Sequence, residues 1–304
     1  MPSTESTATD KRDVYASVTA QIINAIEQGA GSWRMPWHTS GKCALSPINV
    51  TSKKPYRGVN TLCLWAAAQA KGYERGEWAT YAQWQEHHAQ VIRGEKATTV
   101  VFWKFADGTA GTDDDETPKS GSRLLFIRGY SVFNAAQVEG YTPKAEVKTP
   151  MLERIEQADA FFENVGAVVR HGGNQAYYAP FSDHIQMPPF QAFVESVSYY
   201  STLAHEHTHW TSNGARCNRQ LGKRFGDNAY AAEELIAELG AAFTCAHLGL
   251  STEPRADHAA YIDSWLRVLN ADKRAIFTAA SKAQQACDWL VQRAERGQVT
   301  EVAA

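Results

Sequence analysis

The sequence predicts an α+β fold in two domains. Apolar residues recur at helical spacing over several segments in both halves of the chain. Two runs rich in β-branched and aromatic residues, 98–105 and 123–133, have the composition of paired strands. A stretch rich in Pro and Lys separates the halves, as interdomain linkers do. We expect four segments: a disordered lead-in over 1–12, a first domain over 13–140, a linker over 141–150 and a second domain over 151–304.

In the first domain, three helices are expected before the two strands. They are predicted over 13–28, where Gly29 provides the stop, over 62–70, and over 78–84. Thr80 is the candidate N-cap of the third, because its hydroxyl can accept a hydrogen bond from a backbone amide of the first turn.

The second domain is expected to begin with a helix and three short strands and to continue as helices. The helix is predicted over 152–164 and the strands over 167–170, 176–178 and 183–188. Helical patterns then cover 193–203 and the residues just after it, 230–243, and most of the chain to about residue 296.

Composition favours a protein of a reducing compartment. Hydrophobic residues make up 44% of the chain and charged residues 21%, which is ordinary for a soluble globular protein. No apolar run reaches the length of a membrane span, and residues 1–11 have no apolar signal-peptide core. The five cysteines are scattered without a C-x-x-C pair, which argues against a disulfide framework. We expect a cytoplasmic protein with no membrane partner.

The stretch 204–210 contains the pattern H-E-x-x-H, formed by His205, Glu206 and His209. On a helix, residues four apart project from the same face, so the two imidazoles could hold one metal ion. The apolar stripe of 193–203, which has no Pro or Gly, makes a helix plausible here. The short pattern can arise by chance, so a third ligand in a suitable place decides the interpretation.

That ligand is expected on the helical run 230–243. Glu234 and Glu238 are spaced by one helical turn, on a face other than the apolar one. Glu234 is the preferred metal ligand, because Glu238 can then accept a hydrogen bond from a ligating imidazole and fix its tautomer. Glu233 is the reserve ligand.

The spacing also selects among metallopeptidase patterns. The metzincin extension needs a Gly at position 212 and a His at 215, where this chain has Ser212 and Ala215. The remaining pattern is His-His-Glu, as in thermolysin, with a fourth position open for water. This ligand set suits zinc, and manganese or cobalt could also occupy it.

In such a site Glu206 is the candidate catalytic base. It lies about 100° round the helix from His205, where it can take a proton from a water molecule without ligating the metal. Tyr230, Tyr177 and Tyr178 are alternative candidates for stabilising an oxyanion. The strand at 183–188 is expected to form the cleft edge that pairs with an extended peptide.

The first domain has features of a nucleic-acid-binding surface. Residues 1–106 contain 12 Lys and Arg and 8 Asp and Glu, which gives them a net charge of +4. Since the whole chain has a net charge of −3, the remaining residues have a net charge of −7. Six of the nine tryptophans precede residue 104 and alternate with cations. Flat aromatic rings stack with bases while cations follow phosphates, which suits single-stranded nucleic acid. The alternative is that these tryptophans form the core.

With these residues laid out, the chain resembles the ArdC-type antirestriction proteins of conjugative plasmids, whose N-terminal segments have relatives in TraC-type primases. The resemblance covers about residues 13–250. Its N-terminal motifs are WRMPW (33–37), PIN (47–49), YRGVN (56–60), GY (72–73), WAT (78–80), IRGEK (92–96) and VFNAAQ (132–137). Its C-terminal motifs are HEHTHWT (205–211) and YAAEELIAEL (230–239).

This resemblance implies a single-stranded-DNA-binding domain followed by a zincin-like metallopeptidase domain. It also implies a role in shielding incoming plasmid DNA from the recipient's restriction enzymes. An unknown protein substrate, bound to DNA, is the expected target of the peptidase site. The candidate DNA-contacting residues are Trp33, Arg34, Trp37, Lys53, Lys54, Tyr56, Arg57, Asn60, Arg93 and Lys96.

Two alternatives stay open. In the first, the protein is a pure DNA-binding antirestriction module whose metal site is structural or vestigial. In the second, it is a peptidase with no nucleic-acid role, and the aromatics are core residues.

Overall fold

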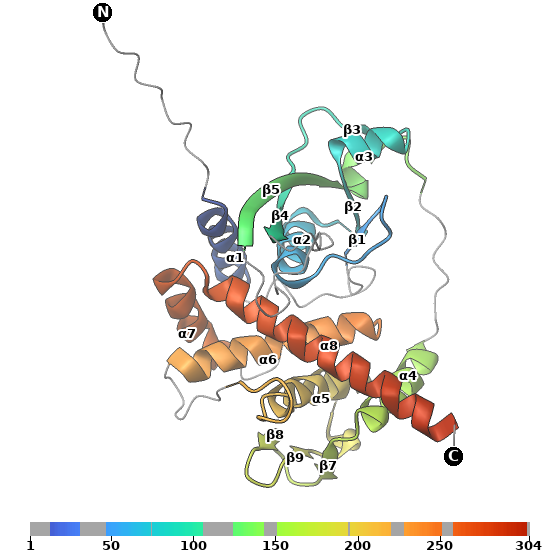
Figure 1. Ribbon diagram of the computed structural model, residues 1–304, viewed down its shortest axis with the longest axis vertical. Coiled ribbons are helices and arrows are strands. Elements are labelled where there is room, and N and C mark those ends of the chain that lie inside the picture. Colours follow the sequence, from blue (N-terminus) through green and yellow to red (C-terminus); the bar gives the residue numbers. More distant parts are fainter. Residues whose placement is uncertain are drawn as a thin grey trace, which may run out of the picture.

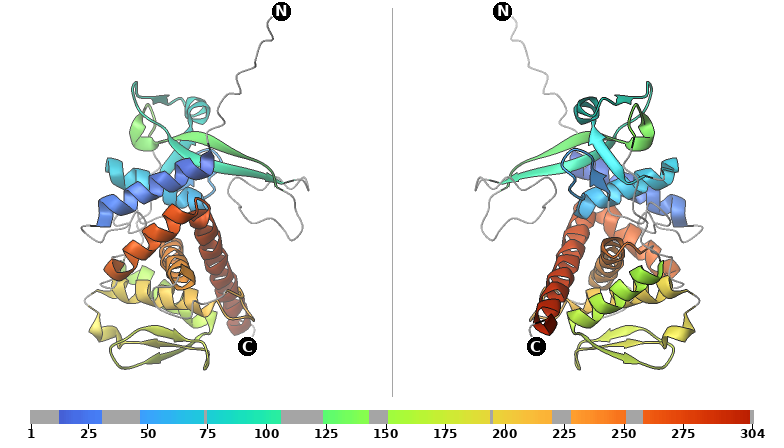
Figure 2. Two further views of the ribbon diagram at one scale, coloured as in Figure 1. Left: turned by 90° about the vertical axis from the view of Figure 1, so that its left-hand side faces the viewer. Right: turned by 90° about the vertical axis from the view of Figure 1, so that its right-hand side faces the viewer.

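A four-stranded and a three-stranded β-sheet lie at opposite ends of the fold, with long helices between them (Figure 1, Figure 2). The computed structural model describes residues 13–30, 47–73, 75–105, 124–142, 151–193, 195–219, 228–250 and 258–302. The predicted lead-in, the predicted linker from residue 143 onward, and Trp33, Arg34 and Trp37 lie outside the described residues. The expected mixture of helix and sheet is confirmed.

The larger sheet has four strands in the order β1-β2-β5-β4. The two strands predicted at 98–105 and 123–133 are present as β4 and β5, and they pair antiparallel with Val100 opposite Tyr130. β2 pairs antiparallel with β5 and parallel with β1. The strands of this sheet are β1 (Ile48–Asn49), β2 (Glu77–Thr80), β4 (Thr98–Phe105) and β5 (Leu124–Asn134), and the separate pair beside it is β3 (Gln90–Val91) with β6 (Val138–Glu139).

Three helices accompany this sheet. α2 ends where Gly72 takes a left-handed conformation, with φ of 67°. Thr80 caps α3, and its hydroxyl and the Gln83 side chain form a capping box. The predicted start of this helix at Trp78 is wrong, because Glu77–Thr80 pairs with β5 as a strand and the helix begins after its cap. The helices are α1 (Val14–Ala30), α2 (Gly58–Lys71) and α3 (Tyr81–Glu86).

Four of the six N-terminal tryptophans are core residues. Trp65, Trp78, Trp84 and Trp103 each have 4% or less of their surface exposed. Burying a large aromatic ring contributes strongly to stability, so these rings serve the fold. The aromatic pattern therefore supports DNA binding less than the sequence alone indicated.

At the other end, a three-stranded sheet has the order β7-β9-β8. β9 is the central strand, parallel to β7 and antiparallel to β8. The prediction that this strand forms a cleft edge is therefore wrong, since both of its edges are already paired. The elements here are α4 (Met151–Val165), β7 (Val168–His171), β8 (Tyr177–Ala179), β9 (His184–Met187) and α5 (Ser196–Trp210).

Three further helices complete the fold: α6 (Asn228–His247), α7 (His258–Ala271) and α8 (Ala275–Val302). α6 and α8 contribute to two separate hydrophobic cores. Leu239 and Phe277 pack with α1, α2 and β4, whereas Cys245 and Leu290 pack with α4, α5 and β9. The N-terminal segment thus shares a core with the C-terminal helices. The boundary predicted at 141–150 stays a prediction.

α5 and α6 pack unusually closely at Gly240. A Cβ atom built at Gly240 would lie 2.5 Å from the Thr208 methyl carbon and 2.6 Å from its hydroxyl oxygen. Thr208 is fully buried, and its hydroxyl donates to the carbonyl of Ala204, so it has little room to move. Gly240 therefore allows the two helices to approach.

We expect Gly240→Ala to destabilise the protein by about 1–3 kcal/mol, the usual cost of overpacking a core. Thermal and urea unfolding measure it. Thr208→Ala removes the two atoms that the new methyl group would meet first. The double variant should consequently be more stable than the sum of the single effects. Additive behaviour would contradict the steric explanation.

Candidate metal centre

His205, His209 and Glu234 converge between α5 and α6. Their ligand atoms all lie within 4.8 Å of one another, and all three residues are buried or nearly so. The Nε2 atoms of the two imidazoles are 3.1 Å apart, and the Glu234 carboxylate lies 3.6 Å from His205 and 3.5 Å from His209. One helical turn separates the histidines, which places both on the α5 face that packs against α6. The three side chains could hold one metal ion.

A second carboxylate lies beside the outer nitrogen of each imidazole. His205 Nδ1 lies 3.0 Å from Glu238, and His209 Nδ1 lies 3.4 Å from Glu233. A proton on Nδ1 leaves Nε2 with its lone pair directed at the shared position, which is the form of histidine that binds metals. Glu238 lies beside His205, and its predicted role of orienting that imidazole stays a prediction. Glu233, the reserve ligand, instead lies behind His209.

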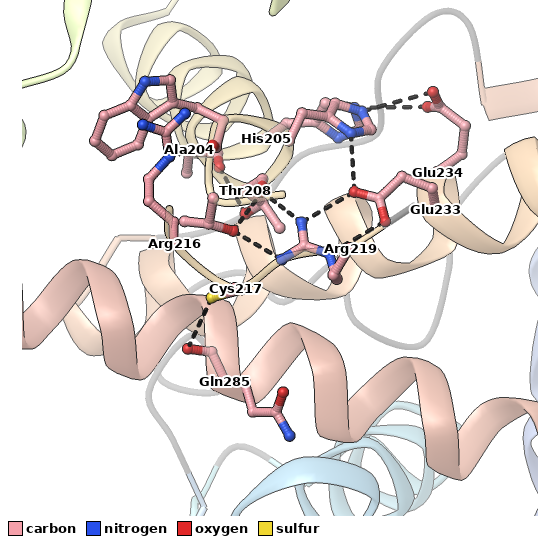
Figure 3. A network of polar contacts seen from close by, with 12 residues as sticks. Ala204, His205, Thr208, Arg216, Cys217, Arg219, Glu233, Glu234 and Gln285 are labelled. Atoms are coloured by element: carbon pink, nitrogen blue, oxygen red, sulfur yellow. Dashed lines mark hydrogen bonds and ion pairs between the residues drawn. The ribbon is translucent and has the colours of Figure 1, made fainter. Parts of the chain in front are cut away.

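Arg219 fixes Glu233 in this position (Figure 3). Its guanidinium donates to both oxygens of Glu233, at 3.1 and 2.9 Å. It also donates to the Thr208 carbonyl at 2.6 Å and to the Thr211 hydroxyl at 2.8 Å. Arg219 thus ties the C-terminal end of α5 to α6. Sequence reasoning missed it because a single Arg after the motif carries no periodic signal.

The electrostatics of the site favour a cation. Burial alone would raise the pKa of Glu234, but hydrogen bonding from His205 and the charges of both histidines lower it to about 2. Burial likewise acts to raise the pKa of Glu233, and the contacts with His209 and Arg219 outweigh it, so the pKa is lowered. The donor set of two imidazoles and an ionised carboxylate fits a divalent metal ion such as zinc or manganese.

The third histidine of the motif is not part of this cluster. Burial lowers the pKa of His207 to about 4, although its hydrogen bond with the Leu203 carbonyl opposes the shift. Its ring packs against Phe162, with centroids 4.7 Å apart. Glu206 is also buried, with 3% of its surface exposed, directly after His205 on α5.

The three candidate tyrosines differ in their surroundings. Tyr230 donates a hydrogen bond to Glu234 and is therefore beside the predicted ligands. Tyr178 donates to Asp183 at 2.8 Å, and Asp183 is ion-paired with Arg216. Tyr177 is 45% exposed. Of the three, Tyr230 alone is recorded in contact with a cluster residue in the described part of the chain.

Replacing Glu238 by Gln is expected to weaken metal binding about 10- to 100-fold, because an amide can present its N–H₂ group to His205 Nδ1 and loses the carboxylate charge. Calorimetric titration with Mn²⁺ measures the affinity. Glu156→Gln, at an exposed position on α4, is the matched control. An unchanged affinity would show that Glu238 does not orient the imidazole.

The predicted DNA-contacting residues are distributed unevenly. Lys53, Lys54, Arg93 and Lys96 are exposed. The prediction for Asn60 is wrong, because its side chain is fully buried and exchanges hydrogen bonds of 2.8 and 2.7 Å with the backbone of Val101.

Two further predicted contacts are partly used within the fold. Tyr56 is 7% exposed, and its hydroxyl accepts from Asn49 at 3.1 Å. Arg57 is ion-paired with Asp288 of α8, so part of its charge is already neutralised. Tyr56 thus contacts β1 through Asn49, and Arg57 contacts α8 through Asp288.

Within the described residues, no helix is both long enough and apolar enough to cross a membrane.

Comparison with known families divides the chain into two matched regions. A model for the N-terminal domain of the anti-restriction factor ArdC matches residues 12–133. A model for zincin-like metallopeptidases matches residues 156–282, which include the metal cluster, by which we mean His205, His209 and Glu234.

Relatives and solved structures extend over almost the whole chain. The protein y4eC of Sinorhizobium fredii, described as uncharacterized, is 52% identical over 301 residues, with 98% of each chain covered. The DNA primase TraC of Escherichia coli is 33% identical over 92% of this chain, which spans only 27% of the primase. Crystal structures of the antirestriction protein ArdC from plasmid R388 are 39% identical and cover 93% of this chain and 98% of theirs. Their TM-scores are 0.74 for the metal-free and 0.72 for the Mn(II)-bound form. The chain therefore belongs to the ArdC antirestriction family, with an ArdC-type N-terminal domain followed by a zincin-like metallopeptidase domain.

Proposed function

We propose that this protein binds single-stranded DNA through its N-terminal domain and protects incoming plasmid DNA from restriction, while a metal-dependent peptidase site acts on DNA-bound proteins. The observation that carries the peptidase half is the convergence of His205, His209 and Glu234, with a carboxylate behind each imidazole. Family membership supports the antirestriction half.

His205, His209 and Glu234 would hold the ion, which we propose to be zinc, with manganese or cobalt as substitutes. Bound there, a divalent cation would polarise a peptide carbonyl and lower the pKa of a water molecule. Glu238 and Glu233 keep both imidazoles in the ligating tautomer, and Arg219 keeps Glu233 ionised and in place. The protein's own contribution is thus a rigid, preorganised set of donors.

Glu206 is proposed as the proton acceptor. Its position one residue after His205 puts it beside the ligands without placing it among the three converging donors. Tyr230 is proposed to assist the developing oxyanion, because its hydroxyl already lies at the Glu234 carboxylate.

The exposed lysines and arginines of the N-terminal domain are proposed to contact DNA phosphates. Lys53, Lys54, Arg93 and Lys96 meet the requirement that a phosphate contact be accessible. DNA held there would raise the local concentration of proteins on the same strand near the metal cluster.

A mating assay with restricting and non-restricting recipients tests the antirestriction role. The gene should raise plasmid recovery only in the restricting recipient. In parallel, a fluorescently labelled single-stranded oligonucleotide should bind with an affinity that falls steeply as salt rises, since counterions are released from phosphates. If the gene does not raise recovery in the restricting recipient, the protective role is refuted. Salt-independent or absent oligonucleotide binding would leave a peptidase without a DNA partner.

A further inference from the structure

A pocket of about 290 Å³ opens on the four-stranded sheet, well separated in sequence from the metal cluster. Three parts of the N-terminal domain line it: the segment from Asn49 to Tyr56, the junction of β2 and α3 at Thr80 and Gln83, and the middle of the β4–β5 pair. Its volume is near the lower end of the range for small-molecule sites. A pocket of this size can admit one small planar group.

The β4–β5 side of the pocket is apolar and aromatic. Val100 lies opposite Tyr130 in the sheet register, and Phe102 lies two residues further along β4, so these side chains share one face. The Phe102 and Tyr130 rings meet edge to face, with centroids 6.0 Å apart. Tyr130 is 37% exposed, which leaves part of its ring surface available for stacking.

The polar groups on the other side include two hydrogen-bond donors, the Gln83 amide and the Lys54 ammonium group. The Gln83 carbonyl oxygen accepts from Thr80 and from Asn49, and the Asn49 carbonyl oxygen accepts from two backbone amides. By contrast, these side-chain contacts use the Gln83 oxygen and leave its amide N–H₂ group available as a donor, and Lys54 lines the pocket with an exposed side chain. A bound group with carbonyl or ring-nitrogen acceptors on its edge would match these donors.

Cations lie beside the pocket. Lys54 lines the pocket, and its neighbour Lys53 is exposed. The exposed Arg128 guanidinium lies over the Tyr130 ring, 5.2 Å from its centroid. A single nucleotide within a DNA strand is bound by an aromatic ring that stacks on the base, by donors that meet the base edge and by cations near the phosphates. This pocket offers all three.

We propose that this pocket receives one unstacked nucleobase of single-stranded DNA, with Tyr130 as the stacking surface and the Gln83 amide and Lys54 as donors to the base edge. The proposal rests on the proposed function, since it assumes that the N-terminal domain binds DNA. It adds that binding depends on the bases as well as on the phosphates.

The test compares two oligonucleotides of equal length and charge, oligo-dT and an oligonucleotide whose sites are all abasic. The ratio of their dissociation constants isolates the contribution of the bases, because phosphate contacts are common to both. The wild-type protein should bind oligo-dT roughly tenfold or more tightly than the abasic strand. Anisotropy measurements at two salt concentrations should leave this ratio nearly unchanged while both affinities fall.

Two variants then probe the pocket. Tyr130→Ala removes the ring, and Gln83→Glu replaces the donor by a carboxylate while keeping the capping box of α3, in which Glu serves as well as Gln. In both, the ratio should fall toward one. Tyr177→Ala, at a similarly exposed tyrosine in the second domain, is the matched control and should keep the wild-type ratio. Thermal melting verifies that each variant is folded.

The outcomes separate the two proposals. If the wild-type protein binds neither oligonucleotide, the proposed DNA function fails. If it binds both equally, or if Tyr130→Ala and Gln83→Glu keep the wild-type ratio, DNA binding stands and the base pocket is refuted.

Discussion

Replacing His205 by Ala is expected to weaken metal binding by more than about 100-fold. This exceeds the loss expected for Glu238→Gln, because Glu238 only contacts a ligand whereas His205 is one. The reason is that two donors remain of the three that converge, and the Glu234 carboxylate loses the imidazole that helps to lower its pKa. Metal analysis of the purified protein and calorimetric titration with Mn²⁺ measure the loss.

The stability of the protein provides an independent measurement. A metal ion that binds only the folded protein raises the free energy of unfolding, by roughly 2.7 kcal/mol at a hundredfold excess over the dissociation constant. Mn²⁺ should therefore raise the melting temperature of the wild-type protein but not of His205→Ala. His171→Ala, which replaces a histidine outside the cluster, is the control and should respond like the wild type. Full metal binding by His205→Ala would refute the assigned ligand set.

Replacing Glu206 by Gln is expected to leave metal binding intact and to lower peptide cleavage about 10²- to 10⁴-fold, the usual contribution of a positioned general base. The amide has nearly the same size as the carboxylate, so the buried position on α5 should be preserved, but it cannot accept the proton. Cleavage of an unfolded protein such as casein, followed with the metal-loaded protein, measures the effect. A variant that cleaves at the wild-type rate would refute the role of Glu206.

The same variant separates the proposed function from its binding-only alternative. If protection of DNA depends on cleavage, Glu206→Gln should lose it in the mating assay while still binding the oligonucleotide. If Glu206→Gln protects fully, the N-terminal domain protects DNA by binding alone and the metal cluster is structural or vestigial.

The convergence of the candidate metal ligands could be predicted from sequence because their spacing follows helical periodicity. His205 and His209 are one turn apart on α5, and Glu234 and Glu238 are one turn apart on α6. Once two helices carry donors at this spacing, one packed face can bring them together. The strands β4 and β5 were predictable for a similar reason, since their composition identifies them locally.

What could not be predicted depends on contacts between distant segments. Asn60 has the residue type of a DNA contact, and its partner Val101 is more than 40 residues away in the chain, so its structural role was invisible. The position of Glu233 depends on Arg219, which comes from an irregular segment after α5. The strand character of Glu77–Thr80 is imposed by pairing with β5 and not by its own residues.

The sharing of α6 and α8 between the two cores has a consequence for how the chain can be divided. A cut within the predicted linker would leave the first fragment without the helices that cover α1 and α2, and their apolar side chains would face water. We expect the separated fragments to aggregate. The TraC primase, a much longer protein, fits this view, since it retains sequence matching 92% of this chain, both halves included. We therefore expect the two halves of the chain to be inherited together.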